Sequence, residues 1–350
     1  MATQSTTAPY DFESGVYRPP SEGGSSSLLV RFTRNCPWNR CAFCAMYKKE
    51  KFEIRPPAEI KRDIDAMAAV AHAVRAPQSN GGVLHEALMD LMAKEPRLNN
   101  NPAIAMLIEW LLSGAKTAFL QDANSLIMKT DHLVDVLRYL RKTFPSLKRV
   151  TSYARSRTLM RKSAQELSAI HQAGLDRLHV GLESGDDLLL KKIDKGVTAE
   201  GHIRGGRKAL AAGFQLSAYW MPGLGGKALW PNHARNTARV LNAIDPHYIR
   251  SRPFYPMPET ALDEELRAGS LELLTAGEQL IELRSMIEAL NLTSRVCFDH
   301  AGNYWKRRDG TLLFSHSYEG YKFPEEKPTV LALIEEGFKA RNRRPNILNL

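Results

Sequence analysis

Short apolar runs rich in β-branched and aromatic residues recur along the first 255 residues of the chain, and longer segments with apolar residues at helical spacing separate them. Short runs bounded by polar residues or glycine are typical of strands that are buried on both faces. The pattern predicts six strands, at Ser27 to Thr33, Thr117 to Leu120, Arg149 to Tyr153, Asp176 to Gly181, Phe214 to Trp220 and Tyr248 to Arg252.

The segments between these strands predict helices. They cover residues 58–74, 83–92, 103–112, 131–142, 163–173, 187–193, 199–212 and 233–243. Gly174 and Gly213 directly follow two of them, at the position where glycine ends a helix at little cost. Alternating strands and helices imply a parallel sheet covered by helices, which is an α/β fold.

Polar or glycine-rich residues follow several of the predicted strands. Asp122 and Asn124 follow the second strand, Glu183 and Ser184 follow the fourth, and 222–226, Pro-Gly-Leu-Gly-Gly, follows the fifth. In parallel sheets ligands bind at the carboxyl ends of the strands. We therefore expect these segments to share one functional face.

Three of the four cysteines lie within nine residues, just after the first predicted strand. Cys36, Cys41 and Cys44 have the spacing C-x4-C-x2-C. Thiolates suit zinc or iron–sulfur clusters, but a structural zinc site normally takes four ligands, often in two separated pairs, and Cys297 is distant in sequence. A disulfide is disfavoured in a reducing compartment. Three ligands on one loop favour a four-iron cluster with one iron left open, whose edge Phe43 would shield.

The cysteine motif resembles that of the radical S-adenosylmethionine (radical SAM) superfamily, although the usual first gap is one residue shorter. The resemblance covers about residues 17–255 and implies a partial (β/α)6 TIM-like barrel. Within the superfamily, the chain is similar to the branch of oxygen-independent coproporphyrinogen oxidases, methylthiotransferases and Elongator's catalytic subunit. In that branch the chain looks closer to a group of short radical SAM proteins. The shared features are the long first gap between cysteines, the run 46–48, the Gly-Leu-Glu-Ser-Gly segment and the late His-x-x-Asn-Tyr stretch at His300.

The resemblance implies two cofactors. Cys36, Cys41 and Cys44 would bind a [4Fe–4S] cluster, and S-adenosylmethionine would chelate its open iron. An electron from a flavodoxin- or ferredoxin-like donor would then cleave S-adenosylmethionine, giving methionine and a 5′-deoxyadenosyl radical that abstracts hydrogen from the substrate.

The resemblance also implies roles for the strand-end residues in binding S-adenosylmethionine. Asp122 and Asn124 stand where the family contacts the methionine amino group. Glu183 and Ser184 stand where polar groups reach the ribose or methionine, and Lys195 where a basic residue pairs with the carboxylate. Gly223, Gly225 and Gly226 would let the backbone approach the adenine.

Each of these residues also has a purely structural interpretation. Asp122 and Asn124 suit an Asx-turn or a helix N-cap, and Ser184 suits an N-cap. Lys195 suits a solvated helix end, and the glycines suit a tight turn. Sequence alone leaves both interpretations open.

Basic residues also follow or occupy the third and sixth predicted strands. Arg155 and Arg157 follow the third strand with Tyr153, and Arg250 and Arg252 alternate onto one face of the sixth. Buried cations need anionic partners, so we expect at least one of these arginines to contact ligand and the substrate to be anionic. Surface arginines are the alternative for Arg155 and Arg157.

Residues 256–350 differ from the rest and are expected to form a helical and irregular cap, with helices at 276–290 and 328–339. Cys297 suits either a buried small side chain or a hydrogen donor to a radical. His300, Tyr304 and Trp305 would contribute to a substrate pocket or pack the cap. Ahead of the barrel at 27–255, residues 1–26 form a mostly flexible lead, and 76–102 look inserted.

Composition changes this interpretation little. The chain has 350 residues, 43% hydrophobic and 25% charged, with a net charge of +10. No apolar run reaches the ~20 residues of a membrane span, and no signal peptide is recognised, so a cytoplasmic protein is expected. The positive charge fits a basic surface better than a nucleic-acid site, since no RNA-binding motif accompanies it.

The leading hypothesis is therefore a radical SAM enzyme with an unknown substrate. One alternative is a non-catalytic iron–sulfur or zinc protein that binds partners or transfers electrons. Another is a tRNA-modifying enzyme of the same superfamily. Neither a second cysteine cluster nor a cobalamin-binding domain is recognised in the sequence.

Overall fold

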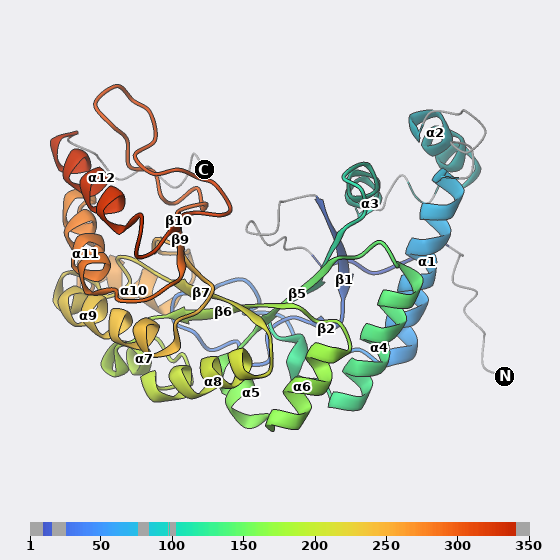
Figure 1. Cartoon of the computed structure of the whole chain (residues 1–350), viewed down its shortest axis with the longest axis horizontal. Coiled ribbons are helices and arrows are strands. Elements are labelled where there is room, and N and C mark those ends of the chain that lie inside the picture. Colours follow the sequence, from blue (N-terminus) through green and yellow to red (C-terminus); the bar gives the residue numbers. More distant parts are fainter. Residues whose placement is uncertain (1–9, 16–25, 76–83, 97, 99–102, 341–350) are drawn as a thin grey trace. The chain divides into compact units, whose positions relative to one another are not determined.

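The computed structural model describes residues 10–15, 26–75, 84–96, 98 and 103–340 of the chain (Figure 1). The chain divides into two compact units. The first comprises the described residues of 1–35, 52–153 and 169–176, and the second comprises those of 36–51, 154–168 and 177–350.

The first unit contains three parallel strands. β1 (Ser27–Arg31) pairs with β4 (Thr117–Gln121), which pairs in turn with β5 (Arg149–Ala154). A short antiparallel pair, β2 (Thr33–Arg34) and β3 (Glu53–Ile54), follows β1. The helices of this unit are α1 (Pro57–Arg75), α2 (Leu84–Lys94), α3 (Ala103–Leu112), the 3-10 turn η5 (Ser125–Ile127), α4 (Thr130–Thr143) and α6 (Ala164–Gln172), whose last residues belong here.

The second unit continues the same alternation with four parallel strands. They are β6 (Arg177–Glu183), β7 (Gln215–Trp220), β8 (Tyr248–Ser251) and β9 (Arg295–Cys297), and β10 (Tyr321–Lys322) pairs antiparallel with β9. The helices are α5 (Ser156–Arg161), α7 (Asp187–Lys192), α8 (Ala199–Ala211), α9 (Gly226–Ile244), α10 (Ala261–Arg267), α11 (Ala276–Ala289) and α12 (Lys327–Lys339).

These elements confirm the predicted α/β fold class. All six strands predicted from the sequence are present, as β1 and β4 to β8, and they run parallel within each unit. Gly174 and Gly213 follow their helices with φ of 106° and 97°, as the sequence predicted. Local side chains fix other helix starts: Thr198 caps α8, and Thr275 forms a capping box with Glu278 at α11.

Some elements were not predicted. β9 and β10 lie within residues 256–350, for which the sequence predicted helices and irregular structure only. Strands of three and two residues leave no period-two signal in a sequence, which is why they were not predicted. α9 begins at Gly226, well before the predicted residue 233, with Pro231 inside the helix. The predicted insertion at 76–102 and lead at 1–26 lie partly outside the described residues, and the division into lead, barrel and cap stays a prediction.

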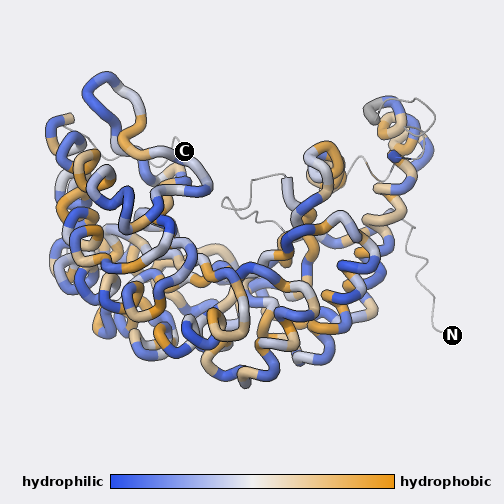
Figure 2. The backbone as a smooth tube through the Cα atoms, viewed as in Figure 1, coloured by the Kyte–Doolittle hydropathy of each residue, from blue (hydrophilic) through white to orange (hydrophobic). Residues whose placement is uncertain are grey.

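Apolar residues lie under the helices and along the strands. α3 is apolar along most of its length (Figure 2) and buries seven of its ten residues. In the second unit Leu189, Ile193, Leu224, Phe254, Leu262 and Leu271 form one buried cluster. None of the helices described is both long enough and apolar enough to cross a membrane.

Substitution of Gly185 tests the packing between the end of β6 and α9. A Cβ atom there would lie 2.3 Å from the backbone oxygen of Asn236 in α9, and backbone cannot rotate away as a side chain can. We expect Gly185→Ala to lower the free energy of unfolding by about 1–3 kcal/mol. Gly277→Ala is the control, because a Cβ at Gly277 meets nothing within 4 Å and alanine favours a helix. Urea unfolding of both variants measures the difference, and equal stabilities would contradict the packing described.

Candidate functional site

The cysteine loop is held on both sides by backbone hydrogen bonds. The N–H of Ala42 donates to the carbonyl of Ile193, just after α7, over 2.9 Å, and the carbonyl of Ala42 accepts from Leu262 in α10 over 3.1 Å. Ala42 and Phe43 pack against the apolar cluster that contains Ile193 and Leu262. Ala42 and Phe43, which lie between Cys41 and Cys44, therefore fix the loop to the second unit.

The three thiols form the kind of donor set that a cluster needs. Cys36, Cys41 and Cys44 are free and half-buried. Burial raises the pKa of Cys41 and Cys44, and the charge of Lys195 opposes this at both thiols. Among the residues described, no group of three or more His, Cys, Asp or Glu side chains is arranged to hold a metal ion. The fit of a cluster thus rests on the number and chemistry of the donors and on the cation beside them.

Lys195 and Glu183 form a buried ion pair next to this loop. Their Nζ and Oε1 atoms are 2.9 Å apart, and each side chain is 12% exposed. Glu183 ends β6 with a φ of 63°, an unusual backbone for a residue with a side chain. A Cβ on Gly181 would lie 2.2 Å from the Glu183 carboxylate, so the pair lies directly over this glycine. Burial alone would lower the pKa of Lys195, but Glu183 and Cys41 raise it.

Trp38, in the cysteine loop, is surrounded by arginines. The guanidinium carbons of Arg40, Arg155 and Arg157 lie 5.0, 4.8 and 5.5 Å from its ring centre. The indole N–H donates to the carbonyl of Asp194 over 2.6 Å, and Arg155 donates to the carbonyl of Lys195 over 2.8 Å. Arg155 and Arg157 thus stack on the cysteine loop, and Arg40 is 66% exposed. Tyr153 belongs to the first unit, where its ring packs on Phe119.

A buried imidazole joins the loops after β6 and β7. The Ser184 hydroxyl lies 2.8 Å from Nδ1 of His233 in α9, and Nε2 of His233 lies 3.1 Å from the Met221 carbonyl. With the proton on Nε2, the ring accepts from Ser184 and donates to Met221. Asp186 caps α7 instead, so Ser184 is not the N-cap that the sequence allowed.

The glycines after β7 meet protein atoms. The N–H of Gly223 donates to the carboxylate of Glu282, a fully buried residue of α11, over 2.5 Å. Gly225 precedes α9, and a Cβ there would lie 3.0 Å from the backbone of Leu229. A Cβ on Gly226 would lie 2.7 Å from the carbonyl of Glu272. Close packing accounts for these glycines, and their approach to an adenine stays a prediction.

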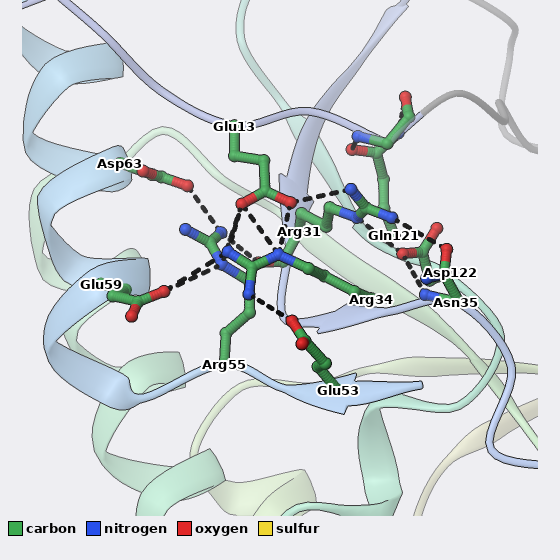
Figure 3. Close-up of polar contacts among 11 residues, drawn as sticks. Glu13, Arg31, Arg34, Asn35, Glu53, Arg55, Glu59, Asp63, Gln121 and Asp122 are labelled. Carbon is green, nitrogen blue, oxygen red and sulfur yellow. Dashed lines mark hydrogen bonds and ion pairs between the residues drawn. The ribbon is translucent and has the colours of Figure 1, made fainter. Parts of the chain in front are cut away.

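Asp122 is held by the strand next to it in the first unit. Its Oδ2 accepts from Nε of Arg31 over 2.7 Å and from the N–H of Asn35 over 2.9 Å, as Figure 3 shows. Like Glu183 it ends its strand with positive φ, here 68°. Asn124 is fully buried just before η5. Asp122 therefore fixes the residue that precedes Cys36, and contact of either residue with a methionine amino group stays a prediction.

Residues 10–15 attach to the same strand ends. Glu13 accepts from Arg31 over 2.7 Å and from Arg34 over 2.6 Å (Figure 3), and Gly15 exchanges two backbone hydrogen bonds with the Gln121 side chain. Burial would raise the pKa of Glu13, but Arg34, Arg55 and Arg31 lower it. Part of the predicted flexible lead is thus tied to β1 and β4.

Arg250 of β8, and Arg252 directly after this strand, have partners within the chain. Arg250 is fully buried and pairs with Asp299 over 2.7 Å, and the guanidinium of half-buried Arg252 lies 4.4 Å from the ring centre of Tyr219. Cys297 is a buried thiol whose pKa burial raises to about 12. Tyr304 stacks on buried Trp305, whose indole donates to the carbonyl of Ala276, so Trp305 packs against the start of α11.

Sequence reasoning missed His233, Glu282, Asp299 and Trp38. A lone histidine or acidic residue within a helix gives no signal that its side chain is buried. Trp38 lies inside the cysteine loop, so the sequence could have marked it as a candidate site residue. Asp299 directly precedes the His-x-x-Asn-Tyr stretch that begins at His300.

Comparison with known proteins finds similar solved structures, while no family model and no curated protein matches. Coproporphyrinogen III oxidase (HemN) from Escherichia coli, described as a radical SAM enzyme, aligns at a TM-score of 0.48 and 13% identity, covering 77% of this chain and 54% of that one. The radical SAM methyltransferase TsrM from Kitasatospora setae aligns at 0.46 and 15%, covering 69% and 39%.

Archaeal Elp3 from Methanocaldococcus infernus aligns at a TM-score of 0.46 and 13% identity, covering 68% of this chain and 58% of that one. This chain thus spans 39 to 58% of the length of the three structures. HemN and TsrM belong by name to the superfamily that the cysteine motif resembles. Because these likenesses are distant, the function is inferred from the chain's own residues.

His233 makes stability depend on pH. Burial lowers its pKa from 6.5 to about 4. Between these values the unfolded chain binds a proton that the folded chain excludes, so the free energy of unfolding falls as the pH falls from 6.5 towards 4. At pH 5 the loss from His233 is on the order of 2 kcal/mol.

Urea unfolding at pH 7 and pH 5 measures this loss, and His233→Gln is expected to reduce it. His132→Gln, at an exposed position, is the control for removal of an imidazole. An unchanged pH dependence in His233→Gln would show that His233 is not held neutral by the fold.

Proposed function

We propose that the chain is a radical SAM enzyme. One observation supports this above the others: three free, half-buried cysteines share one fixed loop, with the Lys195–Glu183 pair beside them. Bound there, a [4Fe–4S] cluster and S-adenosylmethionine would supply the reductive cleavage that yields the 5′-deoxyadenosyl radical, which abstracts hydrogen from a substrate.

The Lys195–Glu183 pair suits the amino-acid end of S-adenosylmethionine. The Nζ of Lys195 is a buried cation that can receive a carboxylate, and Glu183 is an acceptor for an ammonium or a ribose hydroxyl. Gly181 leaves room for both side chains. Ser184 and His233 hold the backbone that follows Glu183, which keeps the pair in position. Gly223, Gly225, Asp122 and Asn124 remain proposed contacts to the same cofactor.

An external one-electron donor completes the proposal, because cleavage requires an electron. The loop exposes Arg40, Lys48, Lys49 and Lys51. A cationic surface next to the thiols favours an acidic donor, such as a flavodoxin- or ferredoxin-like protein. Free thiol ligands fit a reducing compartment, in keeping with the proposed cytoplasmic location.

Two other functions make different predictions. A non-catalytic iron–sulfur or zinc protein would bind metal without cleaving S-adenosylmethionine, and the buried Lys195 would then have no ligand to receive. A tRNA-modifying enzyme would bind RNA in a strongly salt-dependent way. No observation on the described residues favours either above the leading proposal.

The first prediction tests the cluster and the cleavage together. After anaerobic reconstitution with iron and sulfide we expect about four iron atoms per chain. Reduction with dithionite and addition of S-adenosylmethionine should then produce 5′-deoxyadenosine. The triple change of Cys36, Cys41 and Cys44 to Ala should abolish both. Bound zinc, or a cluster that never forms 5′-deoxyadenosine, would rule out the proposed chemistry.

The second prediction concerns Lys195. Lys195→Gln removes the buried cation, and we expect the Kd of the reconstituted protein for S-adenosylmethionine to rise at least tenfold, as for the loss of one charge-assisted hydrogen bond. Lys195→Arg should retain much of the affinity. Equilibrium dialysis measures the Kd.

Lys191→Gln, at an exposed position of α7, is the matched control. Because Lys195→Gln leaves Glu183 without its ion-pair partner, the double variant with Glu183→Gln separates a folding defect from a binding defect. Unchanged affinity in both variants would remove Lys195 from the proposed site.

A further inference from the structure

Arg155 lies at the start of α5 and stacks on the cysteine loop. Its carbonyl accepts from the N–H groups of Thr158 and Leu159 over 2.8 and 3.1 Å, which fixes its backbone to the helix. Its guanidinium carbon lies 4.8 Å from the ring centre of Trp38, which stands between the first two cysteines of the loop. Because an arginine keeps its charge when it stacks on an aromatic ring, this contact places a fixed cation beside the loop.

The same guanidinium is bonded to the segment that carries Lys195. Nη2 of Arg155 donates to the carbonyl of Lys195 over 2.8 Å, and the Trp38 indole donates to the carbonyl of the preceding residue, Asp194, over 2.6 Å. A Cβ on Gly196 would lie 2.4 Å from the Trp38 ring. Three consecutive residues thus pack on the stack of Trp38 and Arg155, so the guanidinium can leave the loop only by breaking its bond to Lys195.

α8 holds the start of α5 in place and reports the charge there. Ser156, which follows Arg155, is buried, and its hydroxyl lies 2.7 Å from Nδ1 of His202 in α8. A Cβ on Gly205 would lie 2.7 Å from the carbonyl of Ser156, so the two helices approach closely. Burial, with the charges of Lys195 and Arg155, lowers the pKa of His202 to about 3. A buried imidazole thus responds to both cations, which indicates a positive electrostatic potential in this part of the second unit.

The thiols of the loop lie within reach of the same charges. Burial raises the pKa of Cys41, and the charges of Lys195 and Glu183, which form an ion pair, act on it in opposite directions. The charge of Arg155 lowers it. Burial lowers the pKa of Arg155, and Cys36 and Cys41 in turn raise it. Arg155 therefore supplies a positive charge to two of the three proposed cluster ligands, in addition to the ion pair.

Two other arginines contact the same ring and differ in how strongly water screens them. Arg40 lies 5.0 Å from the ring centre of Trp38, but it is 66% exposed and pairs with Asp194 over 2.9 Å. Arg157 lies 5.5 Å from the ring centre and is half-buried, as is Arg155. Because solvent screens exposed charges more than partly buried ones, Arg155 and Arg157 act on the loop more strongly than Arg40 does.

We propose that Arg155, assisted by Arg157, raises the reduction potential of the [4Fe–4S] cluster that the three cysteines would hold. The inference rests on the proposed function, because it concerns the cluster of that same site. A four-iron cluster bound by three thiolates is anionic, and its reduction adds a further negative charge. A nearby cation therefore stabilises the reduced form more than the oxidised form. The step transfers one electron from the external donor to the cluster and breaks no bond, so a higher potential lets a weaker reductant supply that electron.

The test is a redox titration of the reconstituted protein without S-adenosylmethionine, in which the EPR signal of the reduced cluster gives the midpoint potential. Arg155→Gln removes the charge and keeps a donor for the carbonyl of Lys195. At a fixed potential we expect this variant to show an at least tenfold smaller ratio of reduced to oxidised cluster, which is a midpoint lower by ~59 mV or more for one electron. Arg155→Lys keeps the charge and should stay close to the unchanged protein. Arg161→Gln, exposed on α5, is the matched control and should leave the potential unchanged.

Arg157→Gln is the second charge-removing variant, for use if Arg155→Gln does not fold or load iron, and it should give a smaller shift in the same direction. The inference is overturned by an unchanged midpoint in whichever of these two variants loads iron, or by a fall in Arg155→Lys as large as in Arg155→Gln. Formation of 5′-deoxyadenosine with either outcome leaves the proposed function intact. A lowered potential without cleavage of S-adenosylmethionine keeps the role of Arg155 and removes the radical chemistry, and a protein that takes up no cluster removes both.

Discussion

The burial of charge at the ends of β6 and β8 is the constraint around which the second unit is arranged. The ammonium of Lys195 is paired with Glu183, whose carboxylate lies over Gly181, and Glu183 has a left-handed backbone that a residue with a side chain disfavours. Such strain persists where the surroundings fix it, and here Ser184 and His233 fix the next residues. Arg250 depends in the same way on Asp299, and Asn303 attaches the loop that follows Asp299 to Ser251 of β8. Each buried ion thus needs a second, neutral side chain that holds its partner.

The local part of this arrangement could be predicted from the sequence. The strands, most helices and the position of the cysteine loop follow from periodicity and spacing, because these properties depend on neighbours in the chain. Glu183 and Lys195 were selected for the same reason: they stand at a strand end and a helix end only twelve residues apart.

The long-range part could not be predicted. The partner of Asp122 is Arg31, 91 residues away, and the partner of Gly223 is Glu282, 59 residues away. Asp122, which follows β4, and Gly223, which follows β7, therefore make structural contacts that a sequence motif does not reveal. Arg250 and Arg252 show the converse: the sequence marked both as candidates for an anion, but only the structure shows that Asp299 neutralises one guanidinium edge and leaves another.

The attachment of Ala42 has a consequence for how the cysteine loop moves. Both backbone groups of this residue are bonded, to Ile193 just after α7 and to Leu262 in α10. The segment between Cys41 and Cys44 can therefore shift only when both hydrogen bonds open, which couples its motion to local unfolding at the end of α7 and in α10. A ligand held by these thiols would in turn protect the amide protons of both helices from exchange with solvent.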